Sequence, residues 1–143
     1  MKHILVLCTG NSCRSQMAHG FLNHFLKHSG HANEASVYSA GIETHGLNPG
    51  AVSTMAQAGI DISQHTSNHV DEYAEIDWDF IITVCDHAQE NCPVIYAPRA
   101  KRLHQNFFDP SKVSGTEKER EIAFAKAREE IKQFCQEFVA REF

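Results

Sequence analysis

The sequence predicts an α/β fold, in which helices flank a four-stranded parallel sheet in a single three-layer domain. Short continuous runs of apolar residues, typical of strands buried on both faces, alternate along the chain with segments of helical periodicity. The 143 residues suffice for one domain with a substantial core, and no repeat or linker divides them. We therefore expect residues 1–143 to form one domain with right-handed crossovers.

The first half of the chain contains two predicted strands, at residues 4–7 and 35–39, with a helix over residues 15–28 between them. Apolar residues at helical spacing indicate that helix, namely Met17, Phe21, Leu22, Phe25 and Leu26. A second helix is predicted to begin at Pro49, because proline suits the first helical position and Asn48 can serve as the cap.

The second half begins with a short helical piece at 71–76, which the buried strand 80–84 follows. Residues 101–105 form a weaker fourth strand. A long last helix is predicted from Thr116 and Glu119, which resemble a capping box. Its apolar stripe is expected to consist of Ile122, Ala123, Ala127, Ile131, Phe134, Cys135 and Phe138.

Charge and cysteine content narrow the function classes. The formal net charge of −5 argues against nucleic acid as a partner, while a local basic pocket for a small anion stays open. No apolar run is long enough to cross a bilayer, and we expect a cytoplasmic protein without a membrane partner. The five cysteines are an odd number. This count favours reactive or core thiols over a framework of disulfides.

A C-x5-R motif, CTGNSCR at 8–14, lies between the first strand and the first helix. In such a loop, backbone N–H groups and the helix dipole can hold an oxyanion, and a guanidinium at Arg14 matches two of its oxygens. The same field favours a thiolate at Cys8 as the nucleophile. A plain alternative is that Cys8 is a small buried apolar residue at a strand end.

We expect the oxyanion to be bound by the seven residues that follow Cys8. These are Thr9, Gly10, Asn11, Ser12, Cys13, Arg14 and Ser15. The hydroxyl of Ser15 could also donate a hydrogen bond to the Cys8 thiolate. Cys13 has two open interpretations: it helps to line the loop, or it packs beneath it.

A second cysteine pair, Cys85 and Cys92, is separated by the polar hexapeptide DHAQEN. Because Cys8 and Cys85 both follow parallel strands, they are expected to meet at the carboxyl edge of the sheet. The spacing of the pair does not match a zinc ribbon, and no metal site is predicted. A disulfide relay suits a loop of this length. Alternatively, the two cysteines are unrelated.

These motifs resemble those of the thioredoxin-coupled arsenate reductases, which have the low-molecular-weight protein tyrosine phosphatase fold. The resemblance rests on CTGNSCRS at 8–15 followed by QMA. It continues through most of the chain, in YSAGIETHG at 38–46, IDISQHTS at 60–67, TVCDHAQENCP at 83–93 and FFDP at 107–110. Several phosphatase families share C-x5-R alone, whereas its combination with the later cysteine pair is more specific.

The resemblance implies reduction of arsenate by three thiols in succession, Cys8, Cys85 and Cys92. Asp109 would protonate the departing oxygen, although an Asp-Pro turn is its ordinary interpretation. Thioredoxin would reduce the final disulfide, with no cofactor, and the protein is expected to be a monomer. The alternatives are a phosphatase that hydrolyses a Cys8 thiophosphate and an oxyanion binder without turnover.

Two positions depart from the family pattern. Some relatives hold potassium beside the loop with a glutamate and an aspartate, where this chain has His19 and Asn68, although Asn11 and Ser39 are retained. Potassium prefers oxygen ligands. We therefore predict no specific activation by potassium. A protonated His19 could supply positive charge instead.

Overall fold

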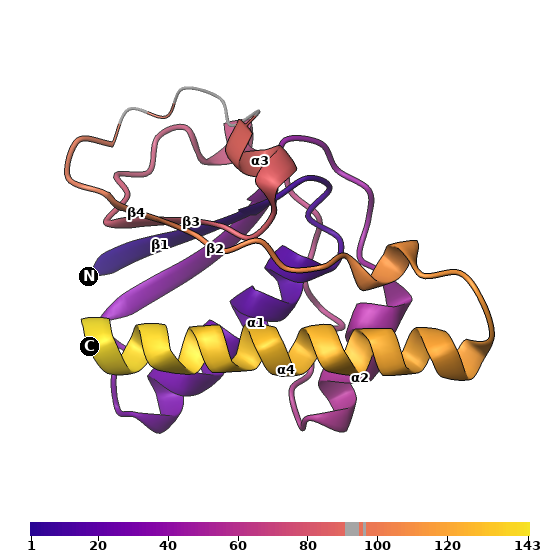
Figure 1. Ribbon diagram of the computed structural model, residues 1–143. Helices are drawn as coiled ribbons and strands as arrows, with labels where there is room; N and C mark the ends of the chain where they lie inside the picture. The colour runs from indigo at the N-terminus through magenta and orange to yellow at the C-terminus, as the bar shows by residue number, and fades with distance from the viewer. Residues whose placement is uncertain (91–94, 96) are drawn as a thin grey trace.

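A computed structural model describes residues 1–90, 95 and 97–143 (Figure 1). Within these residues, four parallel strands form one sheet in the order β2-β1-β3-β4. Their bounds are Lys2–Cys8 for β1, Ala35–Gly41 for β2, Phe80–Thr83 for β3 and Lys101–His104 for β4. The predicted four-stranded parallel sheet is confirmed. The central strand β1 is apolar from Ile4 to Leu7 because both of its faces are covered.

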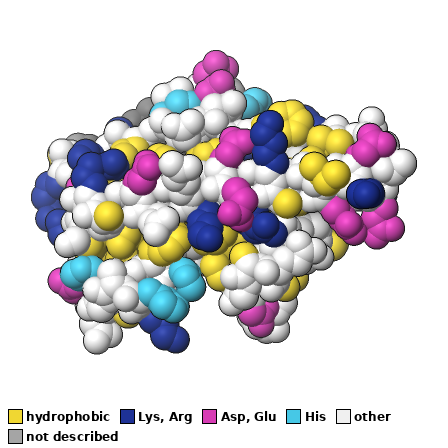
Figure 2. Space-filling view, turned by 60° about the horizontal axis from the view of Figure 1, so that its bottom comes forward, with side chains coloured by type: hydrophobic (Ala, Val, Ile, Leu, Met, Phe, Trp, Pro, Cys, Tyr) yellow, Lys and Arg dark blue, Asp and Glu magenta, His cyan; other side chains and the backbone are white. Residues whose placement is uncertain are grey.

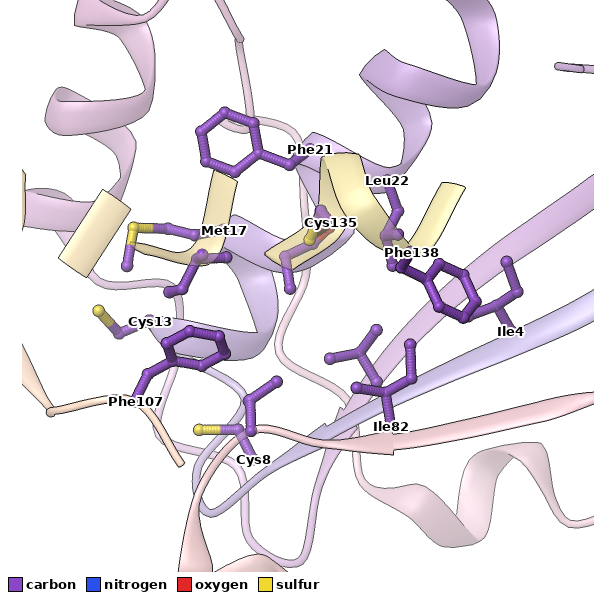
Figure 3. Close-up of a cluster of buried hydrophobic side chains, with 14 of the residues drawn as sticks. Ile4, Cys8, Cys13, Met17, Phe21, Leu22, Ile82, Phe107, Cys135 and Phe138 are labelled. Atoms are coloured by element: carbon purple, nitrogen blue, oxygen red, sulfur yellow. Dashed lines mark hydrogen bonds between the residues drawn. The ribbon is translucent and has the colours of Figure 1, made fainter. Parts of the chain in front are cut away.

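Three helices cover one face of the sheet: α1 (Arg14–His28), α2 (Pro49–Gln57) and α4 (Glu117–Glu142) (Figure 1). The side chains between them and the sheet form the larger apolar core, part of which Figure 3 shows. The predicted caps are present, because Asn48 accepts hydrogen bonds from two N–H groups of α2 and Thr116 accepts one from Glu119. The long last helix is therefore confirmed.

The opposite face of the sheet has a thinner cover. Leu5, Leu7 and Ile81 point into a smaller core beneath Trp78 and the 3₁₀ helix η1 (Val70–Tyr73). The rings of Tyr38, Tyr73 and Trp78 meet edge to face there. Aromatic side chains therefore fill much of this layer, which contains the predicted short helical piece.

The apolar stripe of α4 differs from the prediction at its first turns. Ile122 is 59% exposed, whereas Phe124 is buried. A Cβ added to Gly50 of α2 would lie 2.6 Å from the Phe124 ring, so the ring packs directly on this glycine. Two residues correspond to about 200° around a helix, and this contact therefore turns Ile122 toward solvent. Cys135, expected in the core, is fully buried.

In the part of the chain that the structure describes, no helix combines the length and apolar character needed to span a membrane. Figure 2 shows one face of the molecule, on which Lys and Arg side chains are interspersed with Asp and Glu. This mixed pattern is typical of a solvated surface.

A short helix, α3 (Asp86–Glu90), follows β3 at the carboxyl edge of the sheet (Figure 1). The sequence suggested a flexible hexapeptide here. Five residues are too few for helical periodicity to be recognised, which explains the difference. The carboxyl edge therefore carries α3 beside the loop that joins β1 to α1.

Candidate active site

The loop between β1 and α1 forms the floor of a cavity of about 770 Å³ at the carboxyl ends of β1 and β3. Cys8 enters from the end of β1, Cys85 from the end of β3, and Arg14 from the first turn of α1. Asp109 enters from the segment after β4. Four predicted site residues, far apart in sequence, thus line one cavity.

Four consecutive carbonyl groups of the loop accept hydrogen bonds from residues outside the loop. Those of Thr9, Gly10 and Ser12 accept backbone N–H groups of Glu43, His45 and Asn48, each at 2.9 Å. The Asn11 carbonyl accepts the Gln16 side-chain amide at 2.9 Å. In a trans peptide the N–H points opposite to the C=O, so the N–H groups of residues 10–13 face the inside of the loop. The loop therefore presents a ring of donors suited to a tetrahedral oxyanion.

Asn11 is the fixed corner of this loop. Its φ of 47° lies in the left-handed region, and its side chain is fully buried. The side-chain amide donates to the Ser15 hydroxyl at 2.8 Å, and its oxygen accepts the Asn68 N–H at 2.8 Å. These bonds offset the backbone strain and hold the loop in shape before a ligand arrives.

Two glycines permit the close packing around the loop. A Cβ at Gly41 would lie 2.3 Å from the Glu43 carbonyl oxygen and 2.7 Å from that of Thr9. A Cβ at Gly10 would lie 2.2 Å from the His45 ring. Residues 38–46, which we call the bracket, therefore pack closely against the outside of the loop. Only glycine fits at position 41.

Arg14 is held at the mouth of the loop by two contacts of its guanidinium group. Its Nη1 donates to the Phe107 carbonyl at 3.0 Å, and Nη2 lies 3.5 Å from Asp109 Oδ2. Its Nε is buried without a hydrogen-bond partner among the described residues. An unsatisfied buried donor costs about 1–3 kcal/mol, and an oxyanion in the loop would remove this cost.

The sulfurs of Cys8 and Cys85 line the same cavity, and each shifts the ionisation of the other. The neighbouring Cys8, together with donors from the Thr9 hydroxyl and the Ala88 N–H, lowers the pKa of Cys85 to about 5. Cys85 and burial raise the pKa of Cys8 well above its ordinary value, although Arg14 and the Ser15 N–H act to lower it.

The sequence predicts a thiolate at Cys8, and the structure shows that Cys85 also has hydrogen-bond donors. Ionisation of one sulfur opposes ionisation of the other, so the pair carries a single charge before it carries two. The Thr9 hydroxyl and the Ala88 N–H lie 3.3 and 3.4 Å from the Cys85 sulfur and favour a thiolate there. The bond that Cys8 receives from Ser15 comes from the backbone N–H, whereas the Ser15 hydroxyl bonds Asn11.

Cys13 is a buried side chain at the N-terminus of α1. It is 3% exposed, and burial raises its pKa to about 12. Figure 3 shows Cys8, Cys13 and Phe107 at the same end of the core cluster. Of the two interpretations, packing beneath the loop accounts for its burial, and its N–H still belongs to the inward-facing set.

Asp109 lies in the expected Asp-Pro turn, and its carboxyl group faces the cavity. Its Oδ1 accepts the N–H and hydroxyl of Ser111, at 3.0 and 2.6 Å, so the carboxylate caps the 3₁₀ helix η2 (Pro110–Lys112). Its Oδ2 faces Arg14 in the cavity. The Asp-Pro turn is therefore what places the carboxyl group over the loop.

His19 belongs to a polar cluster behind the loop. Its Nδ1 lies 2.9 Å from the Ser39 hydroxyl, and its ring stacks at 4.5 Å on His65, which bonds Gln16. Burial and the neighbouring His65 lower the pKa of His19 to about 4. This burial favours the neutral ring of His19 at neutral pH. No group of three or more His, Cys, Asp or Glu side chains among the described residues is arranged to hold a metal.

The structure brings together the predicted loop, Cys85 and Asp109, whereas Cys92 lies outside the described residues. Sequence reasoning missed the bracket and the carbonyl of Phe107. It also missed Phe108, which lines the cavity while 61% exposed. A glycine-ended strand followed by a polar loop was the available signal for the bracket. The contacts of Phe108 have no local signature.

A parallel sheet with a C-x5-R loop at its carboxyl edge, a buried thiol and an arginine at its mouth defines an oxyanion-binding protein of the cysteine phosphatase type. Residues 3–142 match the family described as low molecular weight phosphotyrosine protein phosphatase. The chain belongs to this family.

Curated relatives and solved structures show where in the family the chain falls. It is 51% identical over 130 residues to an arsenate reductase of Bacillus licheniformis, covering 91% of this chain and 89% of the relative. With an arsenate reductase of Bacillus subtilis it shares 46% over 137 residues, covering 96% and 94%. A solved arsenate reductase in an oxidized state is 28% identical, with a TM-score of 0.81 over 99% of this chain and 98% of that one. A fourth comparison, with an arsenate reductase in the phosphate binding state, gives 29% identity and a TM-score of 0.75, over 99% of this chain and 98% of that one.

Proposed function

We propose that this protein reduces arsenate to arsenite through Cys8, Cys85 and Cys92, with thioredoxin as the final reductant. The observation that carries the proposal is that Cys8 and Cys85 line one cavity above an oxyanion loop, with the Cys85 sulfur 3.3 Å from the hydroxyl of Thr9, the residue that follows Cys8. Hydrolysis of a phosphate ester needs one thiol, whereas reduction needs a second thiol within reach of the first. The arsenate reductases among the relatives support the same choice.

In the first step, the Cys8 sulfur attacks arsenic while the inward N–H groups and Arg14 hold the equatorial oxygens. Cys8 becomes the thiolate by giving its proton to the Cys85 thiolate. Asp109 protonates the departing oxygen, which leaves as water. The product is a Cys8–arsenic(V) adduct, and no electrons have yet moved.

In the second step, Cys85 releases the proton that it accepted to the solvent, and its thiolate then attacks the Cys8 sulfur. The new S–S bond forms as the S–As bond breaks, and its electron pair stays on arsenic, which leaves as arsenite. The contacts from Thr9 and Ala88 favour this thiolate. Cys92 then attacks Cys85, so Cys8 leaves as a thiolate, and thioredoxin reduces the Cys85–Cys92 disulfide. The protein acts as a monomer in the cytoplasm.

The deciding experiment measures NADPH oxidation with arsenate, thioredoxin and thioredoxin reductase, beside hydrolysis of an aryl phosphate. We expect arsenate-dependent oxidation that Cys8→Ser and Cys85→Ser both abolish. Cys8→Ser should still bind phosphate, because the donor ring stays. Efficient aryl phosphate cleavage that survives Cys85→Ser, without arsenate-dependent oxidation, would contradict the proposal.

A second candidate, phosphate monoester hydrolysis, rests on the shared loop chemistry and on one observation. Phe108, at the edge of the cavity and 61% exposed, offers a ring surface on which an aryl leaving group could stack. Phe108→Ala should lower aryl phosphate cleavage by more than it lowers arsenate reduction.

A further inference from the structure

A bridge of side chains ties Thr83 and Asp86, which precede and follow Cys85 in the chain, to the end of β4. His104 is the last residue of β4 and lies opposite Thr83 in the strand register. Its Nδ1 lies 2.7 Å from the Thr83 hydroxyl, and its Nε2 lies 2.6 Å from Asp86 Oδ1. Cys85 is thus enclosed between two residues that bond the same imidazole ring.

The chemistry of the three groups fixes the direction of the bonds. An ionised Asp86 carboxylate can only accept, so Nε2 of His104 carries the proton. In the neutral ring, Nδ1 then accepts the Thr83 hydroxyl. The Asp86 N–H donates to the Asn106 side chain at 3.0 Å, which adds a second tie to the segment after β4.

The bridge bears on the Cys85 sulfur in two ways. It fixes the first turn of α3, from which the Ala88 N–H reaches the sulfur at 3.4 Å. It also holds the Asp86 carboxylate on an imidazole N–H, so this negative charge is directed away from a neighbouring thiolate. His104 is only 23% exposed, which keeps the ring in one place.

We propose that His104 is a positioning residue for Cys85, holding Thr83, Asp86 and the first turn of α3 so that the Cys85 sulfur keeps its hydrogen-bond donors. The inference rests on the proposed function only in assigning Cys85 as the second thiol. His104 itself touches neither sulfur nor oxyanion in this account.

The test follows the ionisation of Cys85 directly, without arsenate. In a Cys8→Ser background, the rate at which iodoacetamide labels Cys85 is measured from pH 4 to 9, with fragmentation mass spectrometry assigning the label. We expect His104→Ala to move the midpoint upward by about one pH unit, which is about a tenfold lower thiolate fraction below the midpoint. Adding Asp86→Asn to His104→Ala should reverse part of this shift, because the released charge is gone.

Two variants keep the test decisive. Lys101→Ala changes the same strand away from Cys85 and should leave the profile unchanged, whereas a shift as large as that of His104→Ala would overturn the inference. His104→Gln, which retains an amide donor and acceptor, carries the test if His104→Ala fails to fold, and it should recover at least half of the shift. An unchanged profile in a folded His104→Ala, or no recovery with glutamine, refutes the role.

The outcome separates the two proposals. If the wild-type protein turns over no arsenate, the proposed function fails while the labelling profile still judges His104. If turnover is present, His104→Ala should lower kcat and change KM for arsenate less, because Cys85 acts after the oxyanion is bound.

Discussion

Gly41→Ala tests whether the bracket shapes the oxyanion loop. The added Cβ would lie 2.3, 2.7 and 2.8 Å from backbone atoms of Glu43, Thr9 and Asn11. Relief requires a shift of about 0.7 Å, the difference between 2.3 Å and the 3.0 Å that real Cβ contacts keep. Overpacking of this kind costs about 1–3 kcal/mol of folding free energy.

The displaced segment is the one that ties the loop carbonyls, so the donor ring should lose its geometry. A misplacement on the order of 1 Å costs up to about 10²-fold in rate, and we expect kcat/KM for arsenate to fall about 10- to 100-fold. Urea denaturation measures stability, and protection of Cys8 from alkylation by phosphate measures anion binding independently of turnover.

Gly46→Ala is the matched control for this change. Gly46 has φ 79°, but no described atom lies within 4 Å of a Cβ built there. An alanine should therefore cost about 1–2 kcal/mol in backbone strain and leave anion binding intact. If Gly41→Ala protects Cys8 with phosphate as well as the wild type does, the bracket does not shape the loop.

Three further predictions concern the core and the polar cluster. Because burial depresses the pKa of His19 from 6.5 to about 4, stability should fall as pH drops from 6.5 to 4, by about 3 kcal/mol in total, and His19→Asn should flatten this part of the urea-melt profile. With imidazole in place of a carboxylate, turnover should not respond specifically to potassium, and a saturable rise with potassium but not sodium would contradict this. Cys135→Ala should lower the free energy of unfolding by about 1–2 kcal/mol and leave arsenate-dependent NADPH oxidation unchanged. The reason is that Cys135 is buried in the core, where its thiol donates to the Ala18 carbonyl of α1. Loss of oxidation without loss of stability would assign Cys135 a redox role.

Local patterns in the sequence were enough for the strands, the long helices and the loop. A continuous apolar run such as Ile4–Leu7 and the C-x5-R spacing are properties of neighbouring residues. The face of α4 that is buried at its first turns could not be predicted from local patterns. Ile122 and Phe124 are both apolar, and only the contact with Gly50 decides which of them is buried. The five-residue α3 was too short to leave a periodic signal.

The members of the candidate site were predictable from the sequence, whereas the hydrogen-bond donors around its thiols were not. Cys8, Arg14 and Cys85 could be placed at one sheet edge from topology alone. The donors near the Cys85 sulfur belong to Thr9 and Ala88, which come from two separate segments. Contacts of this kind are set by tertiary packing, and no spacing rule encodes them.

The pairing of β1 with β3 has a consequence for the life of the chain. Thr9 and Cys85 touch across 76 residues of sequence, and only strand pairing closes that distance. In a chain that is still being synthesised, or has begun to unfold, Cys8 and Cys85 are therefore far apart. The proposed exchange between these two thiols requires the assembled sheet.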